Sequence, residues 1–308
     1  DHVWITHRPS TLQPNETRSI WKAAPPVLEF DTDGTLLSSW GGPGQGYEWP
    51  QLEHGILVDG QDHVWLGAGG DKDSHILKFT RDGKFVAQYG KPGARQTGMA
   101  PAAPAGGRGG GPQYTANSKD PENFGRVAKI FIDPKANEGY VADGYLNHRV
   151  AVIDLDNGKI KRFWGAYGEP PTDENLGPYD PAAPLPRQFR NPMHCAEVSN
   201  DGLVYTCDRP NDRVQVFDQT GKLLKIWPTK LIGPAVMYVD ANDIVYIVEH
   251  NSGMVSVLTL EGERLAHWGD ASFKSCHGIW GDSHGDLYVV RAGPWGRRRR
   301  IVKHVRMG

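Results

Sequence analysis

Hydrophobic and polar residues alternate along most of the chain, in short runs that end at tight-turn signals. One such run, which in most copies ends in a polar residue followed by glycine, recurs at 27–34, 76–83, 150–158, 214–221, 255–262 and 301–308. Five copies are followed by a further strand-like run, with the sequences LLSSWG, FVAQYG, IKRFWG, LLKIW and RLAHWG. Alternation of β-branched and aromatic residues between such turns predicts antiparallel strands joined as meanders.

A complete repeat unit contains four predicted strands, and no segment keeps a helical period over three turns. Six such units in 308 residues predict an all-β fold, namely a six-bladed β-propeller that forms one domain over residues 1–308. The segments VADGYLNHRVAVID and TCDRPNDRVQVFD resemble NHL repeats. The first unit lacks its innermost strand and the last lacks its outermost strand. We therefore expect an N-terminal closing strand to be missing from this sequence.

Two long insertions interrupt the repeats at 91–123 and 168–190, and both are rich in Pro, Gly and Ala. Each lies between the outermost strand of one blade and the innermost strand of the next. Loops of this length inside a compact domain are usually lids, binding loops or solvated excursions. Both interpretations stay open for the first insertion. The second contains more aromatic and apolar residues, which favours an ordered loop.

Charge and hydropathy do not favour binding to nucleic acid or to a membrane. The net charge of −2 gives no electrostatic attraction to nucleic acid or to an anionic membrane. The run of four arginines at 297–300 is too short to change this, and it indicates a solvated loop. No apolar stretch approaches the roughly 18 residues that a membrane span needs.

The three cysteines are too few for a disulfide scaffold. Cys195 and Cys207 flank a predicted hairpin turn and face each other across it, and Cys276 stands apart. We expect Cys195 and Cys207 to be a free buried pair, because directly opposed strand positions rarely suit disulfide geometry.

Three histidines open equivalent segments of three units: His54 in EHGILVDG, His194 in MHCAEVSNDG and His277 in CHGIWGDSHG. The innermost strand of each blade lines the central channel of a propeller. By the order of the repeats the histidines fall in blades 2, 4 and 6, whereas blades 3 and 5 have Val127 and Ala235 near this position. Three imidazoles about 120° apart, with an open fourth position, predict a metal site on the central axis.

The second strand of a blade returns to the face where the first strand began. Residues that end the second strand should therefore surround the same channel mouth, and they include Arg8 in THRP, Tyr145 in DGY and Arg209 in CDRP. A phenol beside cations can act as a general base because they lower its pKa, and a guanidinium suits a substrate carboxylate. Arg149 and Arg213 recur at a repeat-defining position, so we expect them to be structural.

In this order, and over nearly the whole chain, the segments resemble peptidyl-α-hydroxyglycine α-amidating lyase, a six-bladed enzyme. THRP resembles the HRG segment of that family, and DGYLNHRV resembles its segment with the catalytic tyrosine. EHGILVDGQDHVW, PMHCAEVSNDGLVYTCDRPNDRVQVF and CHGIWGDSHGDLYVV resemble the segments with its zinc histidines and an active-site arginine.

The resemblance implies that the three histidines bind zinc, that Tyr145 is the catalytic base, and that Arg8 and Arg209 bind the substrate. The reaction of the family cleaves the N–C bond of a carbinolamide and releases an amide and glyoxylate. The expected substrate is a small molecule or peptide with a carboxylate. The expected protein is a secreted or periplasmic monomer, although no signal peptide is visible in the sequence.

Two positions depart from the family. Gly278 follows the third histidine, where the family has an aspartate that helps to bind structural calcium. Ile56 could still offer one backbone carbonyl, but a single carbonyl makes a poor Ca²⁺ site. Leu146 stands where the family has a disulfide cysteine, so we do not expect that bridge.

Two other functions fit the same residues. Three imidazoles suit zinc, copper and iron alike, so the site could instead activate water for hydrolysis or carry redox chemistry. A propeller can also bind a protein, glycan or RNA through its top face without catalysis. In that case replacing His54 or His194 by alanine would leave partner binding intact.

Overall fold

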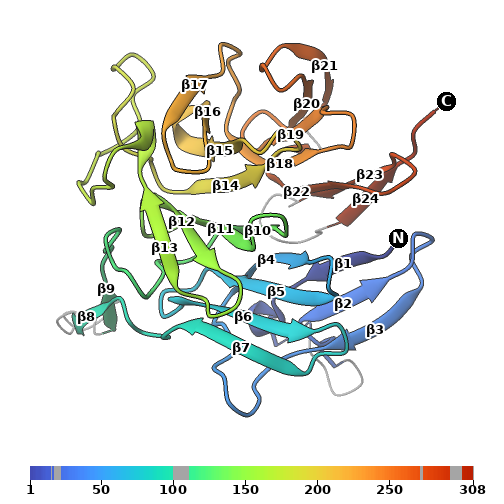
Figure 1. The fold of residues 1–308 in the computed structure, drawn as a ribbon. Coiled ribbons are helices and arrows are strands. Elements are labelled where there is room, and N and C mark those ends of the chain that lie inside the picture. Colours follow the sequence, from blue (N-terminus) through green and yellow to red (C-terminus); the bar gives the residue numbers. More distant parts are fainter. Residues whose placement is uncertain (15, 17–21, 100–110, 271–272, 292–299, 308) are drawn as a thin grey trace.

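The computed structural model describes residues 1–308 except 15, 17–21, 100–110, 271–272, 292–299 and 308. Within the described residues, six antiparallel sheets follow one another along the chain and surround a central axis (Figure 1). The all-β, six-bladed propeller predicted from the repeats is therefore confirmed.

The sheets that form blades 2 to 5 have four strands each, and those of blades 1 and 6 have three in the described part of the chain. Within every blade the strands pair in sequence order. The strands, blade by blade, are β1 (Val3–Thr6), β2 (Val27–Phe30) and β3 (Leu36–Trp40); β4 (Glu53–Val58), β5 (His63–Ala68), β6 (His75–Thr80) and β7 (Phe85–Gly90); β10 (Lys129–Asp133), β11 (Glu138–Asp143), β12 (Arg149–Asp154) and β13 (Ile160–Trp164); β14 (Met193–Val198), β15 (Val204–Asp208), β16 (Arg213–Phe217) and β17 (Leu223–Ile226); β18 (Pro234–Val239), β19 (Val245–Glu249), β20 (Met254–Leu258) and β21 (Arg264–Gly269); β22 (Cys276–Gly281), β23 (Leu287–Arg291) and β24 (Arg300–His304).

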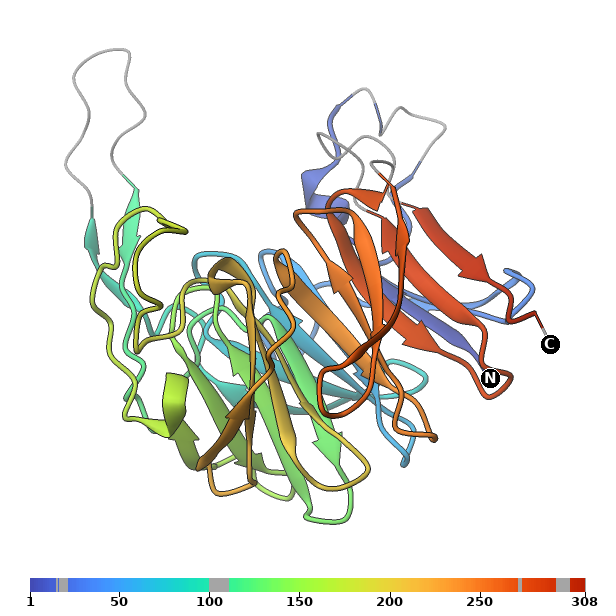
Figure 2. The same cartoon turned by 90° about the horizontal axis from the view of Figure 1, so that it is seen from above.

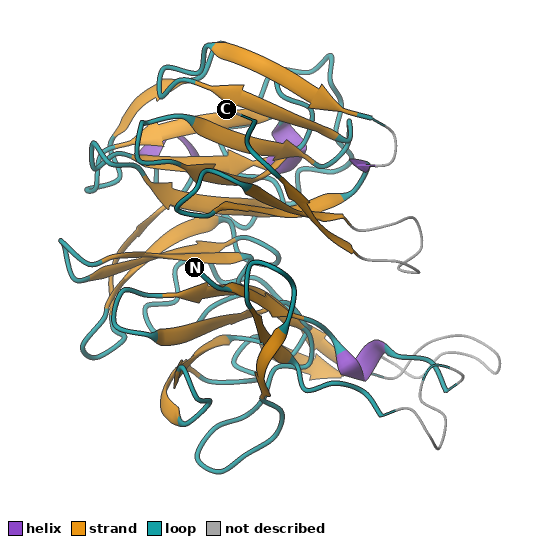
Figure 3. Ribbon diagram, turned by 90° about the vertical axis from the view of Figure 1, so that its right-hand side faces the viewer, coloured by secondary structure: helices purple, strands orange, loops and turns teal. Residues whose placement is uncertain are grey.

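In the described part of the chain, short 3-10 turns lie between strands (Figure 3), and they include η1 (Pro9–Thr11), η2 (Ala166–Gly168) and η3 (Arg209–Asn211). None of the helices in the described part of the chain has the length and apolarity that a membrane span requires.

The polar residues that end the repeated strands close the hairpins. Asp31 Oδ1 accepts hydrogen bonds from the backbone N–H groups of Asp33 (3.0 Å) and Thr35 (2.7 Å). Gly34, in the same turn, has φ of +89°, a conformation that is easily reached only without a side chain. These aspartates are thus turn residues, which is why the Asp-Gly and Asn-Gly pairs mark the strand ends in the sequence.

Two buried ion pairs anchor the turns that later carry functional side chains. Arg149 Nε donates to Asp143 Oδ2 (2.8 Å), and Arg213 Nε donates to Asp208 Oδ2 (2.7 Å). All four side chains are almost completely buried. The arginines expected to be structural therefore tie the start of the third strand to the end of the second, and they fix the loop between.

Apolar side chains fill the spaces between neighbouring blades. Trp65 of β5 packs with Phe124 and Val141 between blades 2 and 3, and Tyr140 packs with Trp164 and other apolar residues between blades 3 and 4. Complete burial of a large apolar side chain stabilises a fold by about 1.5–3 kcal/mol. The ring of blades is therefore held by apolar packing, and the polar side chains at its axis are free to serve a site.

Cys195 and Cys207 form a disulfide, so the expectation of a free pair was wrong. The two residues are direct partners on β14 and β15, and their Cα atoms are 4.8 Å apart. Opposed strand positions at this separation do fall within the range that a disulfide bridges. Cys276 is a free buried cysteine.

The two insertions are joined to each other by Ser118 and Asp173. Ser118 Oγ donates to Asp173 Oδ1 at 2.5 Å, and its backbone N–H also donates to this carboxylate. Phe189, near the end of the second insertion, is fully buried. The first insertion contains a hairpin of β8 (Gln96–Met99) and β9 (Pro112–Tyr114), which projects from the same face of the ring as η1 (Figure 2). Residues 100–110 of this insertion, and 297–299 of the predicted arginine loop, lie outside the described residues.

Candidate metal centre

The three histidines predicted to bind a metal lie on the innermost strands β4, β14 and β22 of alternate blades. Each sits at a break in the strand register. His194 and His277 are the residues skipped where their strands pair with β15 and β23, and in β4 the skipped residue is Gly55, directly after His54. A β-bulge turns a side chain away from the regular alternation. The bulges thus allow these imidazoles to face the axis.

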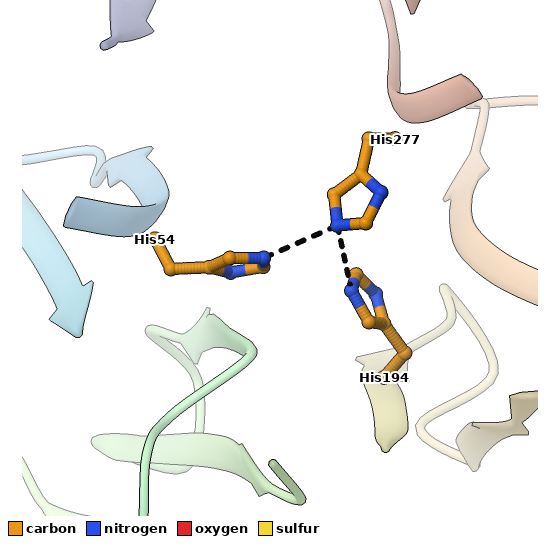
Figure 4. A group of neighbouring side chains, drawn as sticks. All are labelled: His54, His194 and His277. Carbon is orange, nitrogen blue, oxygen red and sulfur yellow. Dashed lines mark hydrogen bonds between the residues drawn. The ribbon is translucent and has the colours of Figure 1, made fainter. Parts of the chain in front are cut away.

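The structure brings the three imidazoles together (Figure 4). His277 Nε2 lies 3.2 Å from His54 Nε2 and 3.1 Å from His194 Nε2. His194 and His54 are only 1% and 8% exposed. The candidate ligand atoms of all three residues lie within 4.8 Å of one another.

Neighbouring blades orient two of these rings. His54 Nδ1 donates to the carbonyl of Ala128 (2.7 Å), and His194 Nδ1 donates to the carbonyl of Ala235 (3.0 Å). A carbonyl oxygen can only accept, so the proton of each neutral ring is on Nδ1 and the lone pair on Nε2 points to the axis. Burial lowers the pKa of His194 well below its ordinary value, and His277, Arg209 and His54 lower it further. Neutral imidazoles held by such contacts are ready metal ligands.

The donor set fits a metal ion. When zinc binds nitrogen at 2.0–2.1 Å in a tetrahedron, the ligand atoms are about 3.3 Å apart. The two measured Nε2–Nε2 distances are 3.2 and 3.1 Å. Lone pairs that face each other this closely inside a protein repel unless a proton or a cation lies between them. A divalent cation at the common point would remove that repulsion for all three rings.

Tyr145 points at the same place. Its Oη lies 2.9 Å from His54 Nε2, 3.0 Å from His194 Nε2 and 3.2 Å from His277 Nε2. Tyr145 follows β11 in the loop anchored by the Asp143–Arg149 ion pair. The pKa of Tyr145 is raised above its ordinary value, because burial outweighs the lowering by the nearby guanidiniums of Arg209 and Arg8.

Arg8 and Arg209 lie at the mouth where the strand order predicts them. Arg8 Nε donates to the carbonyl of Glu53, next to His54, at 2.8 Å. Arg209 interacts with the Tyr145 hydroxyl, and its Nη1 is buried with no hydrogen-bond partner in the described protein. Burial lowers the pKa of Arg209. An arginine fork with an unused donor at the floor of a mouth is suited to an anionic ligand.

Sequence reasoning missed two further residues of the mouth. His250 follows β19 in blade 5, at the position that Arg209 occupies in blade 4, and its ring centroid lies 5.2 Å from that of His277. The strand-end rule used for the other blades would have found it. Arg126 precedes β10, and its guanidinium carbon lies 5.9 Å from the Tyr145 ring. Its φ of +67° and its bond to the Gly69 carbonyl aim it there, and neither has a sequence signal.

One step deeper along the axis, a second polar cluster crosses the channel. Lys129 of β10 forms an ion pair with Glu197 of β14, and its Nζ also donates to the carbonyl of Met237 of β18 at 3.1 Å. Both side chains are largely buried, and burial lowers the pKa of Lys129 to about 7. In this cluster the Lys129 ammonium is the counter-charge of the Glu197 carboxylate.

Comparisons with known proteins agree with the repeats. No protein-family model matches the chain. The chain is 27% identical to NHL repeat-containing protein 3 of Mus musculus over 245 residues, which are 76% of this chain and 58% of that protein. It is 33% identical to peptidyl-glycine alpha-amidating monooxygenase B of Xenopus laevis over 238 residues, which are 73% of this chain and 22% of the enzyme. The chain thus spans little more than half of the first relative and about a fifth of the second.

Solved structures support the architecture alone. A streptogramin B lyase superposes with a TM-score of 0.55 over 92% of this chain and 76% of its own, at 12% identity. A virginiamycin B lyase from Staphylococcus aureus superposes with a TM-score of 0.51 over 91% of this chain and 76% of its own, at 15% identity. The chain is therefore an NHL-type six-bladed propeller whose homologues include a peptidyl-glycine alpha-amidating monooxygenase and NHL repeat-containing protein 3.

Proposed function

We propose that the chain is a zinc-dependent lyase that cleaves the N–C bond of a carbinolamide or a related hydroxylated substrate. The observation that carries this proposal is the meeting of three Nε2 atoms and one phenol oxygen at a single point. The order of these residues along the chain matches the family resemblance, and an amidating enzyme is among the homologues.

The histidines at 54, 194 and 277 would hold the metal through Nε2. Bound zinc would supply Lewis acidity, which lowers the pKa of a substrate hydroxyl, and copper or iron also suits three imidazoles. Gly278 offers no carboxylate and Ile56 offers only one backbone carbonyl, so calcium is not part of the proposal.

The chain's own groups perform the remaining tasks. Arg8 and Arg209 at the mouth bind the substrate carboxylate and orient the scissile bond over Tyr145. Tyr145 takes the proton of the hydroxyl, the carbonyl forms as the C–N bond breaks, and the leaving amide nitrogen takes that proton back from Tyr145. The proton count balances, and the products are an amide and an α-keto acid such as glyoxylate.

The disulfide supports a proposal for the compartment. A Cys195–Cys207 bridge persists in oxidising surroundings and is rare in the cytosol. We therefore propose a secreted or periplasmic protein that acts as a monomer on a small molecule or peptide with a carboxylate.

The test combines elemental analysis with assays of the purified chain. We expect about one zinc per chain and turnover of a peptide ending in α-hydroxyglycine, measured as released glyoxylate. Hydrolysis of simple esters instead would favour the hydrolase. Full activity in the metal-free protein would contradict the proposal. No stoichiometric metal, together with partner binding that survives His194→Ala, would favour the non-catalytic binder.

A further inference from the structure

The donor atoms at the axis are spaced like the corners of a tetrahedron along five of its six edges. Two of these edges join imidazole nitrogens, at 3.1 and 3.2 Å, and three start at Tyr145 Oη, at 2.9, 3.0 and 3.2 Å. A tetrahedron with edges of about 3.1 Å has its centre about 1.9 Å from every corner, close to the distances at which zinc binds nitrogen and oxygen. The phenol oxygen is therefore as well placed for coordination as the three imidazoles.

We propose that Tyr145 Oη is the fourth ligand of the metal, so that four protein atoms close the resting centre. This inference rests on the proposed metal site. It changes the expected arrangement, in which three histidines leave the fourth position open and Tyr145 stands beside the metal as a base.

Hydrogen bonds satisfy both imidazole nitrogens in this cluster only if His277 Nε2 carries a proton as well as the phenol. The lone pairs of His54 Nε2 and His194 Nε2 face Oη, because both rings donate through Nδ1 to backbone carbonyls. A phenol has one proton and can donate to one acceptor only. At least one of the two nitrogens would then face an oxygen lone pair at about hydrogen-bond distance, which is unfavourable in a buried site. A cation at the centre is attracted by all four atoms.

The backbone holds Tyr145 in this position. Tyr145 N–H donates to the carbonyl of Arg126 at 3.1 Å. Gly144, the residue before it, packs so closely on the backbone of Met193 that a Cβ at this position would overlap it. Met193 directly precedes His194. The DGY turn is thus seated against the strand that supplies one of the imidazoles, which fixes the phenol relative to the ligand set.

Three cationic side chains surround Tyr145, although burial raises the pKa of its phenol. The guanidiniums of Arg209, Arg8 and Arg126 all act on Tyr145, and Arg126 lies over its ring. On coordination the phenol proton would pass to solvent, and the cations would stabilise the resulting anion. When a substrate hydroxyl replaces Oη at the metal, the same oxygen is released beside the hydroxyl proton. One atom would therefore serve first as ligand and then as base.

The test uses Cu²⁺ as a probe of the intact chain. Bound copper is counted by elemental analysis, and a phenolate ligand is detected as a phenolate-to-Cu²⁺ charge-transfer band in the visible spectrum. We expect one copper per chain and the band in the wild type, with tyrosine ring vibrations in the resonance Raman spectrum excited within it. Tyr145→Phe should lose the band while copper stays bound. Tyr246→Phe, whose hydroxyl contacts Asp240 instead, is the matched control and should keep it.

The possible outcomes separate this inference from the proposed function. One copper per chain without the band or the ring vibrations in the wild type would overturn the tyrosine ligand and leave the three-histidine centre standing. Failure to bind either copper or zinc would overturn both. If Tyr145→Phe bound no copper, the wild-type Raman spectrum alone would decide, since it reports the ligand without the variant.

Discussion

Two polar clusters lie on the axis of this propeller, and they differ in how their charges are balanced. In the deeper one, Lys129 pairs with Glu197 and donates to a backbone carbonyl, so each charge has a partner within the chain. In the one nearer the mouth, the Nε2 atoms of His54 and His194 and the Oη of Tyr145 lie at hydrogen-bond distance around one point. The histidines, Lys129 and Glu197 come from innermost strands, and both clusters are largely buried.

This difference indicates that the two clusters have different roles. Buried polar groups normally find partners, so a set that is satisfied internally can be explained by the fold. Nitrogen and oxygen atoms that converge on one point are also suited to a cation from outside the chain. The deeper cluster therefore supports the structure of the channel, and we propose that the cluster at the mouth serves its chemistry. Each variant below separates these two roles.

The largest expected effect is that of His194→Ala on zinc binding. Loss of an outer partner of a ligand already costs about 10–100-fold in metal affinity, so loss of a ligand should cost at least about 100-fold and reduce turnover to background. Competition with a chromogenic chelator measures the affinity. His284→Ala, at a histidine that is 77% exposed, is the control and should bind zinc as the wild type does. Unchanged zinc affinity in His194→Ala would contradict the proposal that the cluster at the mouth binds the metal.

Tyr145→Phe should reduce turnover by about 10²–10⁴-fold, because the hydroxyl proton then has no acceptor. The histidines remain, so the protein should still take up zinc when zinc is supplied in excess. Steady-state release of glyoxylate, measured beside zinc content, checks both points. A variant with wild-type turnover would show that Tyr145 is not the base.

Glu197→Gln should lower the free energy of unfolding by about 3–5 kcal/mol, because it leaves the Lys129 ammonium buried without its counter-charge. Replacing both partners, with Lys129→Met and Glu197→Met together, should be close to neutral. Urea unfolding monitored by tryptophan fluorescence measures the difference. The double variant should still bind one zinc; if it did not, the two clusters would be coupled and their separation into structure and chemistry would fail.

Arg126→Gln should have the smallest effect. Its side chain is 27% exposed and also contacts Asp71, so its charge is partly screened and partly balanced. We expect KM for a carboxylate substrate to rise roughly tenfold or less, with the difference shrinking at high salt. An equal change in kcat would instead place Arg126 in the chemical step.

Much of the fold and of the candidate centre follows from the repeats. A strand that recurs in register fixes the blade, and the blade fixes which face of the ring each strand end reaches. For that reason His54, His194 and His277 could be placed around one axis, and Tyr145 beside them, without knowledge of a single distance. The roles of these residues remain proposals.

What the repeats could not predict depends on local geometry. The Cys195–Cys207 disulfide depends on a Cα separation within one strand pair. Arg126 reaches the mouth through a left-handed backbone conformation that the sequence does not mark. The contact of Tyr145 Oη with all three imidazoles depends on how closely the DGY turn packs against β14. None of these quantities has a signature in residue type or spacing.

The strand bulges determine where the ligand set of such a centre can be changed by substitution. Blade 5 has the same break in register at Ala235 that blades 4 and 6 have at His194 and His277. A propeller of this kind therefore has the same bulged position in several blades, and the residue type at that position decides whether the blade contributes a metal ligand. A single substitution in one blade could therefore change the number of side chains that coordinate the metal. The substitution Ala235→His would test whether blade 5 can supply an additional histidine ligand while the other blades stay unchanged.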